Sequence, residues 1–551
     1  MGTWLKRASF SGMCFLISSI LSPRFSQADW IVQFLENKDE KKVRAVRHIP
    51  RNTAKNPRLL RSIPLILSED SRPSKVMYRE VLYSEKRLPE QLISYAHKTE
   101  RFLRKLKWPG SEVKTIIEQG PPSNRINLTF LGDGYTEDEK EKFFSDVSRM
   151  AKDMFTGQTF ASYLPLFNVY AVFVPSNESG LSDRRRVDTV FELYRSPKGS
   201  KRAILPGNTN ALERAIALAP GADYPIVIAN DDFYGGLGGR YAISTRSVRS
   251  GNIVLRHELG HNFGEVGEEY DGGQVYSGAN FSRSKRTDWD HWSEGPIEAF
   301  DVSMHKGEYA WHELKDSPYT MTYNFPSGPA GSYFYALISS VGWSSPDDVH
   351  LHINGNRIPI KGEFHDDRGF FQVGPLKGVP SGKHKMVYSE NANDGNNVLA
   401  ISRVYALPEN YDFTPDRIGA FATFDDSGRM VGYRPTHDSC LMRDMKKKKF
   451  CVVDQENMWT RFLKKVDLID RVDVSENRTV QLYTPKLKDL SVRWYKVESN
   501  GQEVELEDLR SSMSWKADPS HRGTYRAKVR YATPEVRKPT NRFLSAHDFK
   551  L

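Results

Sequence analysis

The chain has 551 residues, which is too long for a single hydrophobic core, so three or four domains are expected. Hydrophobic residues make up 38% of the chain and aromatic residues 12%, which excludes a globally disordered protein. The formal net charge of +10 is mild for this length, and the basic run 446–449 has no interleaved aromatic residues. The composition therefore argues against a nucleic-acid-binding protein.

Residues 1–28 have the organisation of a signal peptide. Lys6 and Arg7 give it a positive start, a short apolar stretch follows at 10–21, and small residues at 26–28 offer a cleavage site. The apolar stretch is too short to span a bilayer, and no later run of about 20 apolar residues exists. We expect a secreted protein without integral membrane association, with a signal anchor as the alternative.

Residues 29–115 are basic and contain strand-like pieces such as 74–78, and Trp108-Pro109-Gly110 is a plausible boundary. They predict an N-terminal β-rich accessory domain or pro-domain. Strands and helices then alternate, which predicts a mixed sheet with packed helices. The predicted strands are 125–132, 167–174 and 224–229, and the predicted helices are 137–154, capped by Thr136, and 211–218.

A glycine-rich run at 234–239 follows these elements. Glycines there would let the backbone approach a substrate closely, and the neighbouring residues 241–245 are predicted to be an edge strand that pairs with an extended peptide. A purely structural hairpin is the alternative.

A helix containing the motif H-E-x-x-H is predicted next. His257 and His261 are one helical turn apart on one face, so both imidazoles can bind a single zinc ion at roughly 2.0–2.1 Å. Glu258 cannot reach the metal as a third ligand and is predicted to take a proton from a water molecule. Gly264 marks the predicted end of this helix, because glycine tolerates the left-handed conformation.

The third ligand is predicted from position. Zinc enzymes that turn the chain at this glycine usually place a His or Asp three residues later, where this chain has Gly267. Glu268, the first carboxylate after Gly267, is the favoured ligand, and Glu269 is the close alternative. A ligand from further downstream, Glu294 or Glu298, is the third possibility.

Residues 257–273, H-E-L-G-H-N-F-G-E-V-G-E-E-Y-D-G-G, closely resemble the zinc-binding stretch of the IgA-peptidase family of zinc metallopeptidases, a metzincin-like group. Three further blocks resemble the same family in the same order: L-G-D-G-Y-T at 131–136, Y-G-G-L-G-G at 234–239 and Y-R-P-T-H-D-S-C-L-M-R at 433–443. The resemblance covers about residues 116 to 465. It implies a metzincin-like catalytic region with one catalytic zinc ion and with Met442 in a turn beneath the metal.

Alternating residues at 349–355 and strand-like pieces at 370–373 and 385–388 predict a β-module inserted in the catalytic domain, before a closing helix at 454–466. Strands at 490–495 and 523–529 predict a C-terminal immunoglobulin-like β-sandwich without the cysteines of that fold. The fold class is therefore α+β. The predicted divisions are a signal peptide (1–28), the N-terminal domain (29–115), the catalytic domain (116–345 and 409–467), the inserted β-module (346–408) and the C-terminal sandwich (468–551).

Two cysteines, Cys440 and Cys451, remain once Cys14 leaves with the signal peptide. An even pair in an oxidising compartment predicts a disulfide, and two buried free thiols are the alternative. Glycosylation sequons begin at four asparagines, of which the first lies in a strand-like run and is expected to stay unmodified. They are Asn127, Asn177, Asn280 and Asn477.

These features predict a secreted zinc endopeptidase that acts on a protein or peptide substrate, with Glu258 as general base. A non-catalytic, protease-like binding protein and a zinc amidase or deacetylase on a non-protein substrate are the alternatives. The intact Glu258 argues against the first of these.

Overall fold

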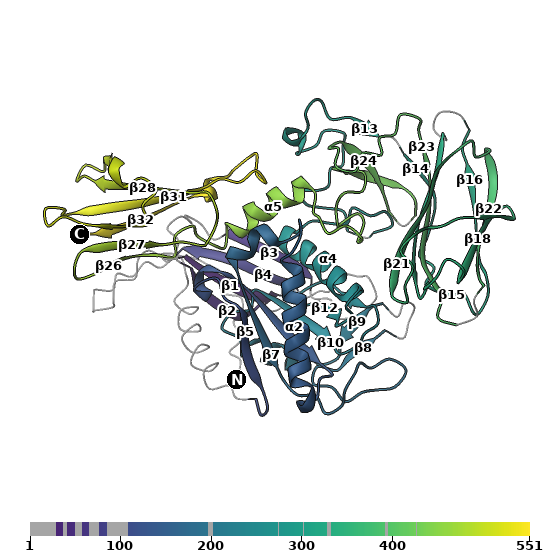
Figure 1. Ribbon diagram of the computed structural model, residues 1–551, viewed down its shortest axis with the longest axis horizontal. Helices are drawn as coiled ribbons and strands as arrows, with labels where there is room; N and C mark the ends of the chain where they lie inside the picture. Colours follow the sequence, from purple (N-terminus) through teal and green to yellow (C-terminus); the bar gives the residue numbers. More distant parts are fainter. Residues whose placement is uncertain are drawn as a thin grey trace.

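The computed structural model describes the backbone of residues 29–36, 41–49, 58–64 and 77–84, and residues 108–196, 202–273, 275–300, 302–327, 332–391, 395–425 and 427–551 in full. The predicted signal peptide lies outside these residues. Figure 1 shows a central region of sheet and helices between a β-rich region around β14–β23 and the C-terminal strands. Few helices and several separate sheets make the chain α+β.

The N-terminal strands form one antiparallel sheet in the order β2-β1-β4-β3. Their bounds are β1 (Asp29–Glu36), β2 (Lys41–Ile49), β3 (Arg58–Pro64) and β4 (Met77–Ser84).

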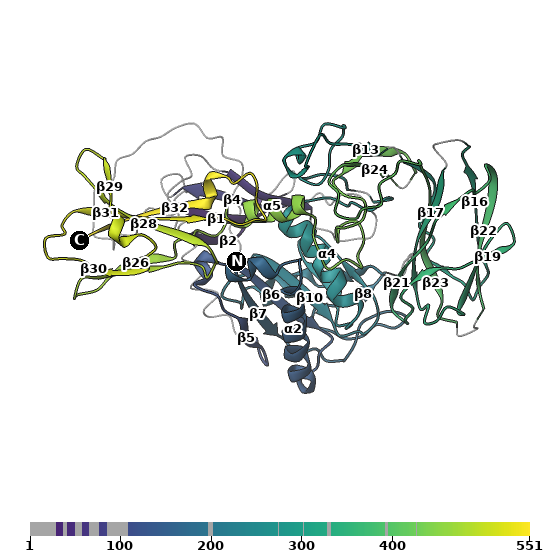
Figure 2. The same cartoon turned by 45° about the horizontal axis from the view of Figure 1, so that its top comes forward.

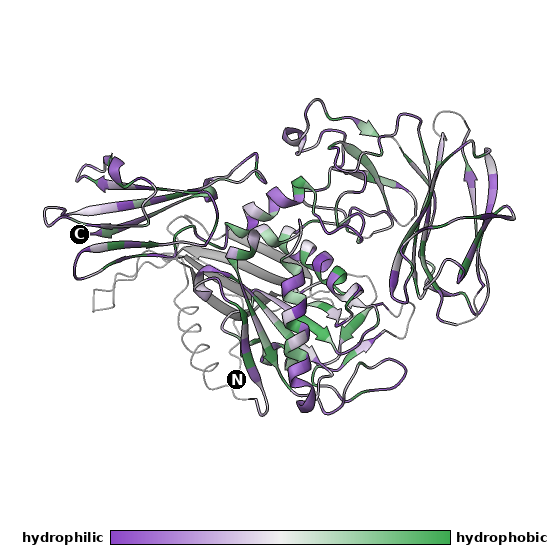
Figure 3. Cartoon of the chain, viewed as in Figure 1, coloured by the Kyte–Doolittle hydropathy of each residue, from purple (hydrophilic) through white to green (hydrophobic). Residues whose placement is uncertain are grey.

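The central sheet has the order β11-β12-β10-β6-β7-β5. Its bounds are β5 (Glu112–Ile117), β6 (Ile126–Asp133), β7 (Phe167–Phe173), β10 (Tyr224–Ala229), β11 (Gly236–Leu237) and β12 (Ala242–Thr245). The four inner strands are parallel, and β5 and β11 are antiparallel at the two edges. Strands β6, β7 and β10 are buried along their whole length, which explains their continuous apolar sequences (Figure 3).

The prediction that residues 241–245 form an edge strand is wrong. Strand β12 lies between β10 and β11, so both of its sides are already paired. The glycine-rich run supplies the edge instead, since β11 consists of Gly236 and Leu237.

The helices of the central region are α2 (Lys140–Met154), α3 (Thr209–Ile216), α4 (Ser250–Gly264) and α5 (Val452–Phe462). The one-sided apolar pattern of α2 is buried, with Phe143, Phe144, Val147 and Met150 all inaccessible. By contrast, α4 is buried on nearly every side. It lies between the sheet and α5 (Figures 1 and 2) and therefore forms the centre of the region.

The β-rich region is a sandwich of two sheets, β14-β23-β17-β21-β20, with β15 on β23, and β16-β22-β18-β19. The bounds of its strands are β14 (Ser303–Glu308), β15 (His312–Glu313), β16 (Tyr319–Phe325), β17 (Tyr333–Val341), β18 (Val349–Ile353), β19 (Asn356–Ile358), β20 (Lys361–Gly362), β21 (Arg368–Lys377), β22 (Gly382–Glu390) and β23 (Val398–Leu407). Both sheets bury side chains in one core, among them Met321 and Tyr388 from one sheet and Ile338 and Phe371 from the other. The pairing begins upstream of residue 346, because β14, β16 and β17 belong to these sheets.

Two small sheets complete this part of the chain. They consist of β8 (Leu193–Arg195) with β9 (Ile204–Pro206), and of β13 (Ala299–Phe300), β24 (Ala420–Phe424) and β25 (Met430–Arg434).

The C-terminal strands form two sheets, β26-β27-β30 and β29-β28-β31-β32. Their bounds are β26 (Arg471–Val474), β27 (Thr479–Tyr483), β28 (Leu490–Val497), β29 (Glu503–Glu505), β30 (Ser514–Lys516), β31 (Thr524–Tyr531) and β32 (Leu544–Lys550). The rings of Trp494 and Trp515, one from each sheet, lie edge to face with centroids 5.7 Å apart. The two sheets therefore pack as a sandwich.

No helix within the described residues is long and apolar enough to cross a membrane.

Candidate active site

Helix α4 places both motif histidines on one face and ends at a left-handed residue. The predicted left-handed residue was Gly264, but Gly264 is still helical and Glu265 takes that conformation, with φ of 49°. The Glu265 N–H donates to the His261 carbonyl at 2.8 Å, and Arg461 forms an ion pair with the Glu265 carboxylate. These contacts hold a conformation that is costly for a non-glycine residue.

The turn that contains Met442 packs directly beneath α4. A Cβ atom on Gly260 would lie 2.8 Å from the Met442 sulfur and 2.9 Å from the Phe450 ring, so only glycine permits this approach. Met442 is completely buried, and its carbonyl accepts a hydrogen bond from the Glu269 N–H at 3.1 Å. The turn thus supports both the helix and the loop that follows it.

Three side chains, two from α4 and one from the loop after it, converge to form the candidate site. The Nε2 atoms of His257 and His261 are 3.2 Å apart, and the two carboxylate oxygens of Glu268 lie 3.2 Å and 3.1 Å from them. These groups together could hold a metal ion. The structure therefore brings the favoured third residue, Glu268, against both histidines.

Neighbouring groups orient these side chains. The His261 Nδ1–H donates to the Val266 carbonyl at 2.8 Å, which leaves the Nε2 lone pair directed at the centre of the site. The Tyr270 hydroxyl donates to Glu268 Oε1 at 2.9 Å, and the Tyr270 ring stacks on His257 with centroids 6.1 Å apart. Tyr270 has no role in the sequence-based prediction, since only the folded loop brings it to the carboxylate.

The electrostatics of the site demand positive charge at its centre. Burial lowers the pKa of His261, but the Glu268 carboxylate more than offsets it and raises the pKa to about 10. Burial raises the pKa of Glu268, but the two imidazoles outweigh it and hold the pKa well below its usual range. The site therefore favours a positive charge at its centre, which a divalent cation would supply.

Glu258 faces the glycine-rich edge of the central sheet. A Cβ atom on Gly238 would lie 2.1 Å from Glu258 Oε2, so the backbone of the glycine run passes against this carboxylate. The edge strand β11 therefore lies next to Glu258. An extended peptide paired with β11 would have its backbone beside that carboxylate.

The residue after Glu268 belongs to a different, completely buried cluster of four side chains, Glu269, Cys440, Cys451 and Asp454. The Cys440 thiol donates to Asp454 Oδ2 at 3.1 Å, and Asn280 donates to Glu269 Oε1 at 3.1 Å. Both cysteines are free, so the predicted disulfide is absent from the structure. Each thiol has a carboxylate acceptor nearby, which satisfies it without a bond between the sulfurs.

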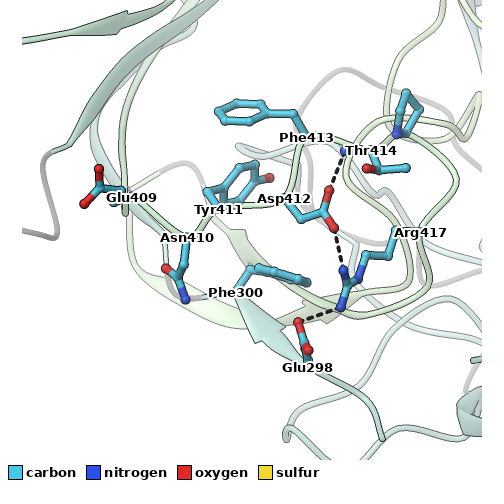
Figure 4. Close-up of a pocket in the computed structure, with 10 residues that line it drawn as sticks. Glu298, Phe300, Glu409, Asn410, Tyr411, Asp412, Phe413, Thr414 and Arg417 are labelled. Carbon is cyan, nitrogen blue, oxygen red and sulfur yellow. Dashed lines mark hydrogen bonds and ion pairs between the residues drawn. The ribbon is translucent and has the colours of Figure 1, made fainter. Parts of the chain in front are cut away.

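The two downstream ligand candidates lie elsewhere. Glu294 is exposed, and Glu298 accepts a hydrogen bond from Arg417 at 2.6 Å. Figure 4 shows Glu298 and Asp412 directed at the same Arg417 guanidinium, at the rim of a pocket of about 560 Å³. Glu298 therefore has its own cationic partner, in a pocket that contains neither motif histidine.

The distant block 433–443 contacts the motif-containing stretch 257–273 at Asp271. Its completely buried carboxylate accepts hydrogen bonds from Arg443 at 2.6 Å, from Tyr405 at 2.6 Å and from the Phe424 N–H at 3.0 Å. Burial alone would raise the pKa of Asp271, but the arginines lower it below its usual value. Asp271 therefore joins the loop after α4 to three segments more than 130 residues away.

Asp367, which immediately precedes β21, is a further residue that the sequence did not predict. Its Oδ2 atom accepts hydrogen bonds from the hydroxyls of Ser247 and Ser250, both at 2.6 Å, at the start of α4. The β-rich sandwich is thereby attached to the helix that carries the histidines. No local sequence signal indicates a contact over more than a hundred residues.

Of the predicted glycosylation sites, Asn177 and Asn477 are exposed. Asn127 is completely buried and Asn280 is 1% exposed, and both donate hydrogen bonds to buried neighbours, so neither side chain is accessible in the folded chain.

Paired histidines one turn apart, backed by a carboxylate and facing a sheet edge, are an arrangement that metallopeptidases use. The family model described as IgA Peptidase M64 matches residues 114–296, about a third of the chain. This confirms the resemblance over residues 114–296, which contain three of the four blocks seen in the sequence, while the block at 433–443 lies beyond the match.

No curated protein matches the chain. Among solved structures, the crystal structure of a Paenibacillus sp. cycloisomaltooligosaccharide glucanotransferase complexed with cycloisomaltoheptaose is similar at 11% identity, with a TM-score of 0.12. The match covers 60% of this chain and 51% of that chain, so this chain spans about half of its length. A similarity this weak carries no argument about fold or function.

Proposed function

We propose that the protein is a secreted, zinc-dependent endopeptidase in which His257, His261 and Glu268 hold the zinc ion and Glu258 is the general base. The family match supports peptidase activity. The observation that carries the proposal is the convergence of the two Nε2 atoms and the Glu268 carboxylate within 3.1–3.2 Å of one another.

These separations fit a zinc ion. Donors that each lie 2.0–2.1 Å from zinc, at tetrahedral angles to one another, are ~3.4 Å apart. The observed separations of 3.1–3.2 Å are close to this spacing. Two imidazoles and one carboxylate are also a donor set known from catalytic zinc sites, in which a fourth position stays open for water or substrate.

Different parts of the chain then have different roles in the reaction. When bound, zinc supplies a Lewis acid that polarises the scissile carbonyl and acidifies a water molecule. Strand β11 pairs with the extended substrate and aligns its backbone beside Glu258. Glu258 accepts the proton of the attacking water and returns it to the departing amine.

Three finer features belong to the same proposal. The packing of Met442 beneath Gly260 supports a metzincin-like catalytic region. The two packed C-terminal sheets with the buried Trp494 support an immunoglobulin-like sandwich. The sequence of residues 1–28 supports secretion, and exposed Asn177 and Asn477 are the sites where glycosylation is proposed.

Profiling of cleavage sites in a mixed proteome tests the proposal. The zinc-loaded protein is expected to generate new internal peptide termini, and both Glu258→Gln and a chelator are expected to abolish them. A protein with bound zinc that generates no new termini would contradict the proposal. A binding protein predicts that outcome, and an amidase or deacetylase predicts release of acyl groups or ammonia without peptide cleavage.

A further inference from the structure

Three arginines near the candidate active site have no ion pair with a carboxylate in the part of the chain that the structure describes. They are Arg202, Arg368 at the start of β21, and Arg403 in β23, and we call them the arginine cluster. Arg202 Nε, Arg368 Nε and Nη1, and Arg403 Nη2 are buried without a hydrogen-bond partner. Arg368 is 6% exposed and Arg403 is 8% exposed, so water screens neither charge well.

Aromatic rings support each guanidinium. The Arg202 Cζ atom lies 5.3 Å from the ring centroid of Tyr309, and Arg403 Cζ lies 5.3 Å from that of Tyr270. The Arg368 Cζ atom lies 4.9 Å from the ring centroid of Tyr234 and 4.8 Å from that of Trp311, and these two rings stack on each other with centroids 6.3 Å apart. Stacking of this kind fixes the guanidinium planes and leaves the N–H groups at their edges free to donate.

The arginine cluster flanks the proposed zinc site. Tyr270, under Arg403, also donates to Glu268 and stacks on His257. The Arg202 carbonyl accepts a hydrogen bond from the Gly236 N–H of the edge strand at 2.8 Å, and the Arg202 side chain lies within electrostatic range of Glu258. The cluster therefore lies beside both the edge strand and the general base.

The carboxylates nearest to this cluster have other roles. Asp271 is close enough to Arg403 for their charges to interact, but it is already bound by Arg443, Tyr405 and a backbone N–H. Glu258 lies at the scissile position in the proposed mechanism. Buried cations without a counter-ion are costly, and a carboxylate brought by a ligand would offset that cost.

A strained backbone conformation occurs next to the arginine cluster. Trp311, which packs on Arg368, has φ of 41°, a left-handed conformation that a bulky residue rarely adopts. Strained residues of this kind concentrate at ligand-binding sites, where the surrounding structure holds them. Strands β21 and β23 of the β-rich sandwich, which carry Arg368 and Arg403, therefore border the proposed site.

We propose that the arginine cluster binds a carboxylate of the peptide substrate close to the scissile bond. The carboxylate comes from an acidic side chain or from the C-terminus of the peptide, and planar guanidinium groups can bind either one through paired hydrogen bonds. The inference rests on the proposed function, because a substrate paired with β11 would run beside the cluster.

Binding to zinc-loaded Glu258→Gln protein tests the proposal without hydrolysis. Three pools of acetylated hexapeptides are compared by calorimetry: one with a fixed Glu and an amidated end, one with Gln in its place and an amidated end, and one with Gln and a free C-terminal carboxylate. At least one carboxylate-bearing pool is expected to bind about tenfold more tightly than the amidated Gln pool. The pool that binds more tightly than the amidated Gln pool identifies the source of the carboxylate.

The arginines are then replaced in the same background. Arg368→Gln and Arg403→Gln are each expected to reduce the affinity advantage of the carboxylate-bearing pool to about twofold or less. Arg417→Gln, in the remote pocket, should leave that advantage unchanged. Circular dichroism checks the fold, and Arg368→Lys, which keeps the charge, replaces Arg368→Gln if the latter unfolds. Arg368→Lys is expected to retain part of the gain.

Equal binding of all three pools by the folded protein would overturn the proposal, as would a gain that survives both Arg→Gln variants. These outcomes are separate from a failure of the proposed function. A wild-type enzyme that cleaves peptides with no preference for carboxylates contradicts only the role of the arginine cluster. Tight binding of carboxylate pools without any cleavage contradicts only the peptidase proposal.

Discussion

Two adjacent residues, Glu268 and Glu269, lie in two different clusters of potential metal ligands. Glu268 joins His257 and His261, where the imidazole lone pairs converge and the His261 side chain is 24% exposed. Glu269 joins two thiols and Asp454 in a cluster that solvent barely reaches, with no member more than 2% exposed.

The difference shows that proximity of ligand atoms alone does not define a metal site. In the histidine cluster, two imidazole nitrogens and a carboxylate face one another at 3.1–3.2 Å, an arrangement that favours a cation. In the buried cluster, thiols and an amide donate hydrogen bonds to the carboxylates. A divalent ion held by two thiolates and two carboxylates would leave a net charge of −2 in a buried place, which is unfavourable. We therefore interpret the second cluster as a protonated structural network.

Catalysis gives the largest expected contrast between the clusters. Glu258→Gln should keep the zinc ion and lower peptide hydrolysis by about 10²–10⁴-fold, the range typical of general-base catalysis. Glu269→Gln, a matched change in the loop after α4, should leave the rate within the same order of magnitude. Hydrolysis of a cleaved peptide and zinc content are measured on both variants. Undiminished hydrolysis by Glu258→Gln would exclude it as the base.

Metal affinity gives the next contrast. His261→Ala should lose zinc, and Glu268→Ala should weaken zinc binding by about tenfold or more, since catalytic zinc sites use three protein ligands. Glu269→Ala should retain zinc with the wild-type affinity. Titration against a competing chelator compares the three variants. Loss of zinc by Glu269→Ala, with zinc retained by Glu268→Ala, would reverse the assignment of the clusters.

The buried network should make stability depend on pH. Burial raises the pKa of Asp454 from 3.8 to about 6, next to Glu269 and the two thiols. Burial likewise raises the pKa of Glu269 from 4.5 to about 8. The folded state therefore keeps protons that the unfolded state has released, and stability should fall as pH rises from about 4 to about 8. Asp454→Asn should flatten this part of the profile. Thermal unfolding with chelator present separates the effect from zinc release, and parallel profiles for both proteins would refute the protonated network.

The thiols give the smallest expected effect. Cys440 and Cys451 are buried, and burial raises the pKa of both thiols, so neither forms the reactive thiolate. The folded protein without residues 1–28 should resist alkylation at both, and denaturation should expose two reactive thiols. Mass spectrometry counts the added groups. A denatured chain that takes up none would show that the disulfide forms after all.

Local sequence predicted the parts of the site that depend on local geometry. The spacing of His257 and His261 determines their common face, because helical periodicity does not depend on the rest of the fold. The apolar runs of β6, β7 and β10 likewise identified the buried strands. Glu268 was favoured over Glu269 only by its position in the loop.

The missed residues depend on contacts between distant segments. Arg368 and Arg403 lie on β21 and β23, which are separated by β17, and no local pattern indicates that this sheet faces the histidines. The edge strand was misplaced by a similar cause, since periodicity does not determine which strand lies outermost. The disulfide was favoured over the alternative of two free thiols because cysteine number alone does not show that a carboxylate lies beside each sulfur.

Helix α4 is held at both ends by residues that the ribosome adds long after it. Asp367 binds the serine hydroxyls at its start, and at its end Asn457 and Arg461 donate to the carbonyls of Gly264 and Phe263 at 2.7 Å and 3.0 Å. A nascent chain that has just exposed the motif lacks all three partners. Both ends of the helix therefore have their complete set of contacts only after residue 461 has been added to the chain.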